Sequence, residues 1–262
     1  MNKIVMHVNS LHFRRAKREI FSDLTFSIEA GQFISLIGPN GTGKSTLLKL
    51  LAGILKVDRG EILLFNQDIS SLKSRDIAKQ ITYMPQTTHL ETNFTVMQVV
   101  EMGRYPHKNR FSNWDPNDAS SVQYAMDLTG ITHLKDRFVP SLSGGERQLV
   151  YLAKTIAQDT PILLLDEPTS DLDIHHQVIV QNIIKTLVKS GKTVIAAIHD
   201  INLATRISDK CMLLKDGIFI AYDEPNEIIQ ANYLEKTFNV KSHIYEEQFS
   251  HKKQIIPYEV LR

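Results

Sequence analysis

The feature that most constrains the fold is a glycine-rich loop between an apolar strand and a helix. Residues 33–37 are apolar and rich in β-forming side chains, as expected of a buried parallel strand, and residues 45–54 have a helical pattern. The segment between them is Gly38-Pro39-Asn40-Gly41-Thr42-Gly43-Lys44-Ser45. It fits the pattern G-x-x-x-x-G-K-[ST], which in this context is a phosphate-binding loop.

Each residue type in this loop suits contact with phosphate. Glycines let backbone N–H groups approach phosphate oxygens without a clash from a Cβ atom. We expect Lys44 to contact the β- and γ-phosphates, the Ser45 hydroxyl to bind Mg²⁺, and Thr46 to belong to the same site. The alternative is a glycine-rich turn that matches the pattern by chance, and the flanking strand and helix argue against it.

A second anion site is expected about a hundred residues downstream. The segment Leu142-Ser143-Gly144-Gly145-Glu146 opens a helix, so its N–H groups and a hydroxyl lie at a positive helix end. One γ-phosphate cannot easily be held by both anion sites of a single chain. The natural arrangement is therefore two chains that share two ATP molecules.

Two acidic residues follow an apolar strand at residues 162–165. Asp166 ends that strand, where a carboxylate can hold Mg²⁺ directly or through water. Glu167 is one residue further on and points elsewhere, so it can accept a proton from an attacking water. The alternative for both residues is an ordinary pair of solvated acids after a strand.

His199 and Gln86 are the other candidates for catalysis. His199 follows a strand at residues 193–198, and the carboxyl end of a parallel strand lies on the ligand side of its sheet. There the imidazole could bind a γ-phosphate and orient a water, or it could be a satisfied loop histidine. Gln86 follows Tyr83-Met84-Pro85, where its amide could reach Mg²⁺ or the attacking water. On its own it would be read as a surface loop residue.

The order of segments predicts an α/β fold with a mainly parallel core sheet, an N-terminal antiparallel β portion and an inserted helical subdomain. Short strand-like segments and polar turns alternate over residues 3–37, and strands alternate with helices around the motifs. We expect a single domain with the following parts: a core at about 1–86 and 158–240, a helical subdomain at about 87–157, and a C-terminal extension at about 241–262.

Composition narrows the possible functions. Thirty basic and twenty-nine acidic residues give a net charge of +1, so no overall basic field favours nucleic acid as a partner. Cys211 is the only cysteine, which excludes an internal disulfide and suits a reducing compartment. Residues 1–19 show no signal peptide, and no apolar run approaches the roughly 18–20 residues needed to cross a bilayer.

Taken together, these motifs resemble the ATP-binding subunits of ATP-binding-cassette (ABC) transporters over about residues 3–235. The resemblance implies a P-loop ATPase that uses ATP and Mg²⁺ as a head-to-tail homodimer. It also implies that Gln86 serves as the Q-loop residue and that Phe13 stacks on adenine. Asp171 would contact the opposite subunit from the loop Ser170-Asp171-Leu172-Asp173, in which Asp173 also suits a helix N-cap.

Two further segments resemble the subfamily that powers import of ferric siderophores, haem or cobalamin. They are Gly103-Arg104-Tyr105-Pro106-His107 and Leu172-Asp173-Ile174-His175-His176-Gln177. The resemblance implies integral-membrane permease subunits as partners, an extracytoplasmic substrate-binding protein as an indirect one, and a peripheral location at the cytoplasmic face of the membrane. By themselves, His175 and His176 read as ordinary structural or exposed positions on a helix.

The chain departs from this family at two positions, and other functions need to be weighed. Leu149 stands where many relatives have arginine, which concerns local packing, and Asp171 replaces a smaller residue, which could alter coupling across the dimer. One alternative is a non-transport ABC ATPase acting on DNA or ribosomes, but no long coiled coil or second cassette is present. An ABC transporter for another cargo remains an open alternative. A switch GTPase is not supported, because this chain has no Asn-Lys-x-Asp segment of the kind that reads guanine.

Overall fold

The computed structural model describes residues 3–86, 93–108 and 115–261. The central layer is a six-stranded sheet in the order β10-β9-β3-β8-β7-β6, whose neighbours are parallel except for the β10–β9 pair. Its strands are β3 (Phe33–Ile37), β6 (Ile81–Met84), β7 (Ile162–Asp166), β8 (Thr193–Ala197), β9 (Lys210–Lys215) and β10 (Ile218–Asp223). The order of the motifs predicted this mainly parallel sheet.

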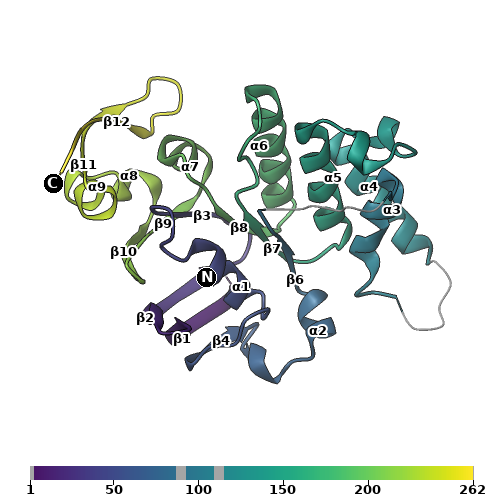
Figure 1. Cartoon of the computed structure of the whole chain (residues 1–262), viewed down its shortest axis with the longest axis horizontal. Helices are drawn as coiled ribbons and strands as arrows, with labels where there is room; N and C mark the ends of the chain where they lie inside the picture. The colour runs from purple at the N-terminus through teal and green to yellow at the C-terminus, as the bar shows by residue number, and fades with distance from the viewer. Residues whose placement is uncertain (1–2, 87–92, 109–114, 262) are drawn as a thin grey trace.

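A second, antiparallel sheet packs beneath the first (Figure 1). Its order is β2-β1-β4-β5, with the bounds β1 (Ile4–Arg15), β2 (Arg18–Glu29), β4 (Arg59–Leu64) and β5 (Gln67–Asp68). The sequence predicted several short strands for this region, whereas β1 and β2 are twelve residues each. The reason is that Ser10 and Asp23 have left-handed backbones inside the strands, where the register shifts. A polar residue at such a bulge resembles a turn in the sequence.

The central strands are buried on both faces, which explains their continuous apolar sequences. Every residue of β3, β7 and β8 is buried. Side chains alternate between two cores: Phe33 and Ile37 face one, and Ile34 and Leu36 face the other. The second core includes helix α1 (Lys44–Leu51) and the antiparallel sheet. The loop before α1 therefore follows a strand that is packed on both faces.

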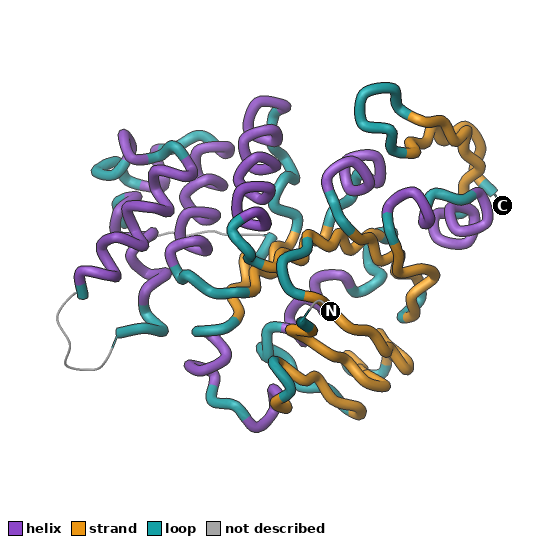
Figure 2. The backbone as a smooth tube through the Cα atoms, turned by 180° about the vertical axis from the view of Figure 1, so that it is seen from behind, coloured by secondary structure: helices purple, strands orange, loops and turns teal. Residues whose placement is uncertain are grey.

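The helices of the first core lie on the other face of the central sheet. They include α3 (Val96–Glu101), α4 (Pro116–Thr129), α5 (Gly144–Ala157), α6 (Ile174–Lys189) and α7 (Ile201–Ile207). Helices α3 to α6 gather at one end of the molecule in both views (Figures 1 and 2). The predicted helical subdomain (about 87–157) begins at residues that lie outside the described ranges, 87–92, and its residues 109–114 lie outside them as well.

A few long-range contacts fix this helical group to the sheet. A Cβ at Gly103 would lie 2.3 Å from the carbonyl oxygen of Lys154, so glycine lets the two segments meet. The amide of Gln158, just after α5, donates to the carbonyl oxygen of Ala78 at 2.6 Å and accepts from the Thr82 hydroxyl at 2.8 Å. Helix α2 (Ser74–Ala78) and strand β6, which leads to Gln86, are thereby tied to the end of α5.

The C-terminal elements lie at the opposite end of the molecule from the helical group (Figure 2). They are α8 (Pro225–Ile228), α9 (Ala231–Phe238) and a hairpin of β11 (Val240–Glu246) and β12 (Lys253–Val260). The hairpin is fastened to α7, because the backbone N–H and C=O of Ile255 both bond the Asn202 side chain, at 2.8 and 3.0 Å. Within the described ranges, no helix is long and apolar enough to cross a membrane.

Candidate nucleotide-binding site

The loop of residues 38–43 adopts a conformation that only glycine permits at two positions. Gly43 has a φ of 100°, and a Cβ there would lie 2.8 Å from side-chain atoms of Ile20 and Phe21. A Cβ at Gly38 would lie 2.2 Å from the carbonyl oxygen of Leu214. The loop is thus pressed against the β1–β2 hairpin on one side and β9 on the other, which points it at the start of α1.

Lys44 extends back over this loop from the first turn of α1. Its ammonium donates to the carbonyl oxygens of Gly38 at 2.7 Å and Pro39 at 3.0 Å. Burial lowers the pKa of the Lys44 amine, and the carboxylates of Glu167 and Asp166 oppose that shift. The cation therefore lies between the loop and two acids, where a phosphate group could replace the carbonyl contacts.

Asp166 is held at the end of β7 by two hydroxyl groups. The Ser45 hydroxyl donates to Oδ1 at 2.9 Å, and the Tyr83 hydroxyl donates to Oδ2 at 3.1 Å. Asp166 is only 2% exposed, so both hydrogen bonds form in a buried setting. Burial, and then the adjacent Asp166 carboxylate, raise the pKa of the Tyr83 hydroxyl well above its usual range. Tyr83 therefore remains a donor at neutral pH and fixes the orientation of the carboxylate.

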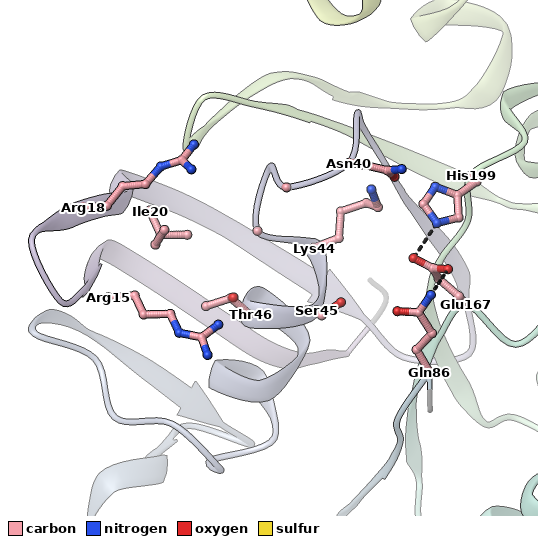
Figure 3. Close-up of a pocket in the computed structure, with 12 residues that line it drawn as sticks. Arg15, Arg18, Ile20, Asn40, Lys44, Ser45, Thr46, Gln86, Glu167 and His199 are labelled. Carbon is pink, nitrogen blue, oxygen red and sulfur yellow. Dashed lines mark hydrogen bonds and ion pairs between the residues drawn. The ribbon is translucent and has the colours of Figure 1, made fainter. Parts of the chain in front are cut away.

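Glu167 turns away from Asp166 because its backbone is left-handed, with a φ of 54°. One carboxylate oxygen, Oε2, accepts a hydrogen bond from the Gln86 amide at 2.6 Å. The other, Oε1, contacts Nε2 of His199. Figure 3 shows the three side chains converging from the ends of β6, β7 and β8. A carboxylate held by two such partners is oriented for accepting a proton.

These side chains line a cavity of about 580 Å³ above the loop (Figure 3). Gln86, Glu167 and His199 lie on one side of the loop, and residues of the β1–β2 hairpin lie on the other. The full lining is Arg15, Arg18, Ile20, Asn40, Gly41, Gly43, Lys44, Ser45, Thr46, Gln86, Glu167 and His199. Pro39 and Thr42 line a neighbouring hollow of about 270 Å³.

The second predicted anion site lies elsewhere, at the start of α5. Ser143 caps this helix, because its hydroxyl accepts a hydrogen bond from the Glu146 N–H at 3.2 Å. In return, the Glu146 carboxylate accepts one from the Ser143 N–H at 2.8 Å. Hydrogen bonds to the Glu146 carboxylate from the Ser143 backbone N–H, and then from the Ser143 side chain, lower the pKa of the Glu146 carboxyl. None of the residues 143–146 lines the cavity at Lys44. The structure therefore keeps the two predicted anion sites apart within one chain.

The start of α5 is packed against α6 through a histidine. A Cβ at Gly145 would lie 2.7 Å from three ring atoms of His176, and Nδ1 of that ring bonds the Asp173 carboxylate at 2.8 Å. Asp173 is also the N-cap of α6, as the sequence suggested. His175 is exposed. His176 therefore has a specific contact with the Ser143–Glu146 segment that its place on a helix did not indicate.

Three other sequence predictions concern residues away from the cavity. Phe13 is 8% exposed and packs in the core with the antiparallel sheet, so the structure does not place it where it could stack on a base in this cavity. Asp171 is exposed, with a φ of 57°, and does not line the cavity either. Leu149 is buried in the core of the helical group, which agrees with a packing role.

Sequence reasoning missed four residues at the site. Arg15, Arg18 and Ile20 line the cavity, and Tyr83 holds Asp166. The hydrogen bond of Tyr83 joins residues 83 positions apart and left no local pattern.

Comparison with known proteins identifies the family. The family model described as "ABC transporter" matches residues 21–170. This chain belongs to the ABC transporter family. It is an ABC ATPase, an enzyme that binds ATP and hydrolyses it for transport. The match spans the glycine loop, the Ser143–Glu146 segment and the Asp166–Glu167 pair.

Two curated relatives are similar over most of this ABC ATPase. It is 38% identical to the petrobactin import ATP-binding protein FpuC of Bacillus anthracis, over 92% of this chain and 89% of that protein. It is 36% identical to the ferric enterobactin transport ATP-binding protein FepC of Escherichia coli (strain K12), over 92% of this chain and 89% of that protein.

Solved structures agree with this identification. An ABC transporter assigned to the metal-chelate type, in an inward-facing conformation, matches with a TM-score of 0.85 and 30% identity over 98% of each chain. A dimeric ATP-binding cassette in a post-hydrolysis state, bound to ADP and Pi, matches with a TM-score of 0.73 and 25% identity over 84% of this chain and 98% of that chain.

Proposed function

We propose that this ABC ATPase energises import of iron–siderophore complexes, with haem and cobalamin as related cargoes, through separate membrane subunits. The proposal is carried by two findings that coincide in one chain. The Glu167 carboxylate is held by Gln86 and His199 beside the glycine loop. The chain is also similar, over 92% of its length, to petrobactin and ferric enterobactin transport ATPases. The Gly103–His107 and Leu172–Gln177 segments support the same subfamily.

In this proposal Glu167 is the general base of ATP hydrolysis. It accepts a proton from the attacking water, a role that contributes roughly 10²- to 10⁴-fold in rate. Gln86 and His199 hold its two oxygens in place, and His199 lies where it could also bind the γ-phosphate. Lys44 and the N–H groups of residues 38–43 would hold the β- and γ-phosphates at the positive end of α1.

The donor set at the end of β7 suits Mg²⁺. The Ser45 hydroxyl and the Asp166 carboxylate are hard oxygen ligands that already lie 2.9 Å apart, and the Gln86 amide is a third oxygen donor at the same edge of the sheet. Mg²⁺ commonly takes one or two such protein ligands and completes its shell with phosphate and water. When bound, the ion would neutralise charge on the β- and γ-phosphates.

The site is proposed to be completed by a second copy of the chain. Ser143 and Gly144 are exposed and Gly145 is half-buried, at a helix start that does not line the cavity of its own chain. This helix start is therefore available to the γ-phosphate held by a partner. Asp171 lies in an exposed loop after Glu167 and would contact the partner. Loss of the bridging phosphate on hydrolysis would then open the dimer.

Integral-membrane permease subunits are the proposed direct partners, with an extracytoplasmic substrate-binding protein acting indirectly and no role for nucleic acid. The chain would then lie at the cytoplasmic face of the membrane. We also propose that the core (about 1–86 and 158–240) and the helical subdomain (about 87–157) move relative to each other when the dimer closes, with residues 241–262 as an extension of the core.

The test is uptake of labelled ferric siderophores, haem and cobalamin in cells that lack this chain. We expect uptake of one cargo to be lost, and to be restored by the wild-type chain but not by Glu167→Gln. Unchanged uptake of all three cargoes would contradict the cargo assignment. Equal rescue by both chains would contradict the role of Glu167.

A further inference from the structure

The two carboxylate oxygens of Asp166 accept hydrogen bonds from two different hydroxyl groups. Ser45 donates to Oδ1 at 2.9 Å, and Tyr83 donates to Oδ2 at 3.1 Å. Ser45 lines the nucleotide cavity, whereas Tyr83 does not. We infer, on the basis of the proposed Mg²⁺ site at Ser45 and Asp166, that Tyr83 is a positioning residue. It keeps Oδ2 occupied, so that Asp166 offers the ion a single oxygen, and this favours Mg²⁺ over Ca²⁺.

The central sheet places the three side chains on one face. Tyr83 of β6 is paired with Leu164 of β7, and Asp166 lies two residues beyond Leu164. Because side chains alternate along a strand, these residues share a face. Leu164 and Tyr83 pack in the core that includes α1, the helix that carries Ser45. The Asp166 carboxylate therefore accepts one hydroxyl from α1 and the other from β6.

The segments around Tyr83 hold it in place. The adjacent Thr82 donates its hydroxyl to the Gln158 side chain at 2.8 Å, and the Gln158 amide donates to the carbonyl oxygen of Ile81 at 3.2 Å. Gln158 thus fastens β6 to the end of α5. With its backbone held there and its ring packed in the core, Tyr83 has little freedom to turn its hydroxyl away from Oδ2.

The occupied oxygen decides which ion the carboxylate suits. Asp166 is buried, and a buried carboxylate oxygen that loses its hydrogen bond is left unsatisfied. Ca²⁺ has a large, flexible shell and readily takes both oxygens of one carboxylate, whereas Mg²⁺ demands a small octahedral shell and usually keeps several waters. With Tyr83 on Oδ2, Asp166 presents Oδ1 alone, next to the Ser45 hydroxyl. This arrangement suits Mg²⁺ and withholds the two-oxygen contact that Ca²⁺ can use.

The test measures how much each ion strengthens binding of ADP, which has no γ-phosphate to be hydrolysed. Calorimetry on the full chain gives the dissociation constant of ADP in EDTA, in excess Mg²⁺ and in excess Ca²⁺. The gain from an ion is the EDTA value divided by the value with that ion. For Tyr83→Phe we expect the Mg²⁺ gain to fall about tenfold or to vanish, as is usual when a metal-ligating group loses its hydrogen-bond partner. The Ca²⁺ gain should stay the same or rise, because Oδ2 is then free to bind that ion.

Tyr222→Phe is the matched control. Like Tyr83, Tyr222 packs against the same core and donates its hydroxyl at 3.1 Å, but its acceptor is the carbonyl oxygen of Ser27. This variant should change neither gain. Binding of ADP in EDTA should be unchanged in both variants, because neither tyrosine lines the cavity. That measurement, together with thermal unfolding, shows that each variant is folded with its nucleotide cavity intact.

The possible results separate the role of Tyr83 from the proposed Mg²⁺ site. If Mg²⁺ does not strengthen ADP binding to the wild-type chain, both the Mg²⁺ site and the role of Tyr83 are contradicted. If the wild-type chain shows a Mg²⁺ gain that Tyr83→Phe retains, the role of Tyr83 alone is overturned. Equal falls in the Mg²⁺ and Ca²⁺ gains would also overturn it, because they would show a general loosening of Asp166 rather than a choice between ions. None of these results depends on the transported cargo.

Discussion

Replacement of Gly145 by alanine tests whether the start of α5 is held by packing against His176. A methyl group at Gly145 would lie 2.7 Å from three atoms of the imidazole ring, which is well inside normal contact distance. The ring must move, and moving it weakens the 2.8 Å bond to Asp173. Overpacking costs about 1–3 kcal/mol and a lost hydrogen bond about 0.5–1.5 kcal/mol. We therefore expect the free energy of unfolding to fall by about 2 kcal/mol.

The neighbouring glycine provides a matched control. A Cβ at Gly144 meets nothing within 4 Å, so Gly144→Ala in the same helical turn should leave stability unchanged or slightly raised. His176→Ala removes the ring and should make room for the added methyl group. In the double variant Gly145→Ala/His176→Ala, the loss should therefore be at least about 1 kcal/mol smaller than the sum of the single losses.

Urea unfolding of these four variants, of Gly144→Ala/His176→Ala and of the wild type measures these values. We expect a favourable coupling energy between positions 145 and 176, and none between positions 144 and 176. Additive effects at Gly145 and His176 would refute it, because they would mean that the methyl group and the ring do not compete for the same space. A Gly144→Ala variant as unstable as Gly145→Ala would refute it as well.

Three other predictions follow from buried groups. Glu167→Gln should lower the rate of phosphate release about 10²- to 10⁴-fold, because the amide keeps the shape of the carboxylate but not its basicity. The affinity for ATP in equilibrium binding should change less than about threefold. A rate within tenfold of wild type would contradict the role of Glu167 as general base. Burial raises the pKa of the Cys211 thiol to about 12. Ellman's reagent at pH 8 should therefore titrate no thiol in the folded chain and one after unfolding. The free energy of unfolding should fall as the pH rises above the ordinary thiol pKa of 9.0, because only the unfolded chain then loses the proton. Arg104→Ala should lower the free energy of unfolding by about 3–5 kcal/mol, because it leaves the buried Asp118 without its partner at 2.8 Å. Adding Asp118→Asn to this variant should recover part of the loss. No recovery would show that the unpaired Asp118 carboxylate is not the cause of the lost stability.

Sequence alone predicted those parts of the site that a local pattern determines. The glycine loop, Asp166 and His199 each follow a short apolar strand, and the carboxyl ends of parallel strands meet at one edge of a sheet. The structure brings Lys44, Gln86, Glu167 and His199 around one cavity. The start of a helix at the Ser143–Glu146 segment was likewise predicted from that segment alone.

The contacts that sequence could not supply are those between distant segments. Gln158 joins α5 to Ala78 and Thr82, and His176 packs on Gly145, yet none of these pairs leaves a pattern in the chain. The placement of Phe13 failed for a related reason. Which side chain of a strand reaches a cavity depends on register and on bulges; the register of β1 and β2 changes between Phe13 and Arg14, and Arg15 lines the cavity whereas Phe13 does not.

We propose that one chain holds only part of the site, and that a second copy brings the start of its α5 to the γ-phosphate. Size-exclusion chromatography with light scattering on Glu167→Gln, with saturating Mg·ATP and without it, tests this claim directly. We predict a shift from the 29.8 kDa chain to a pair only when ATP is present, and no shift when Gly144→Asp is added, because its charge would repel the phosphate. A chain that remains monomeric at saturating ATP, or that pairs equally well with Gly144→Asp, would contradict the account.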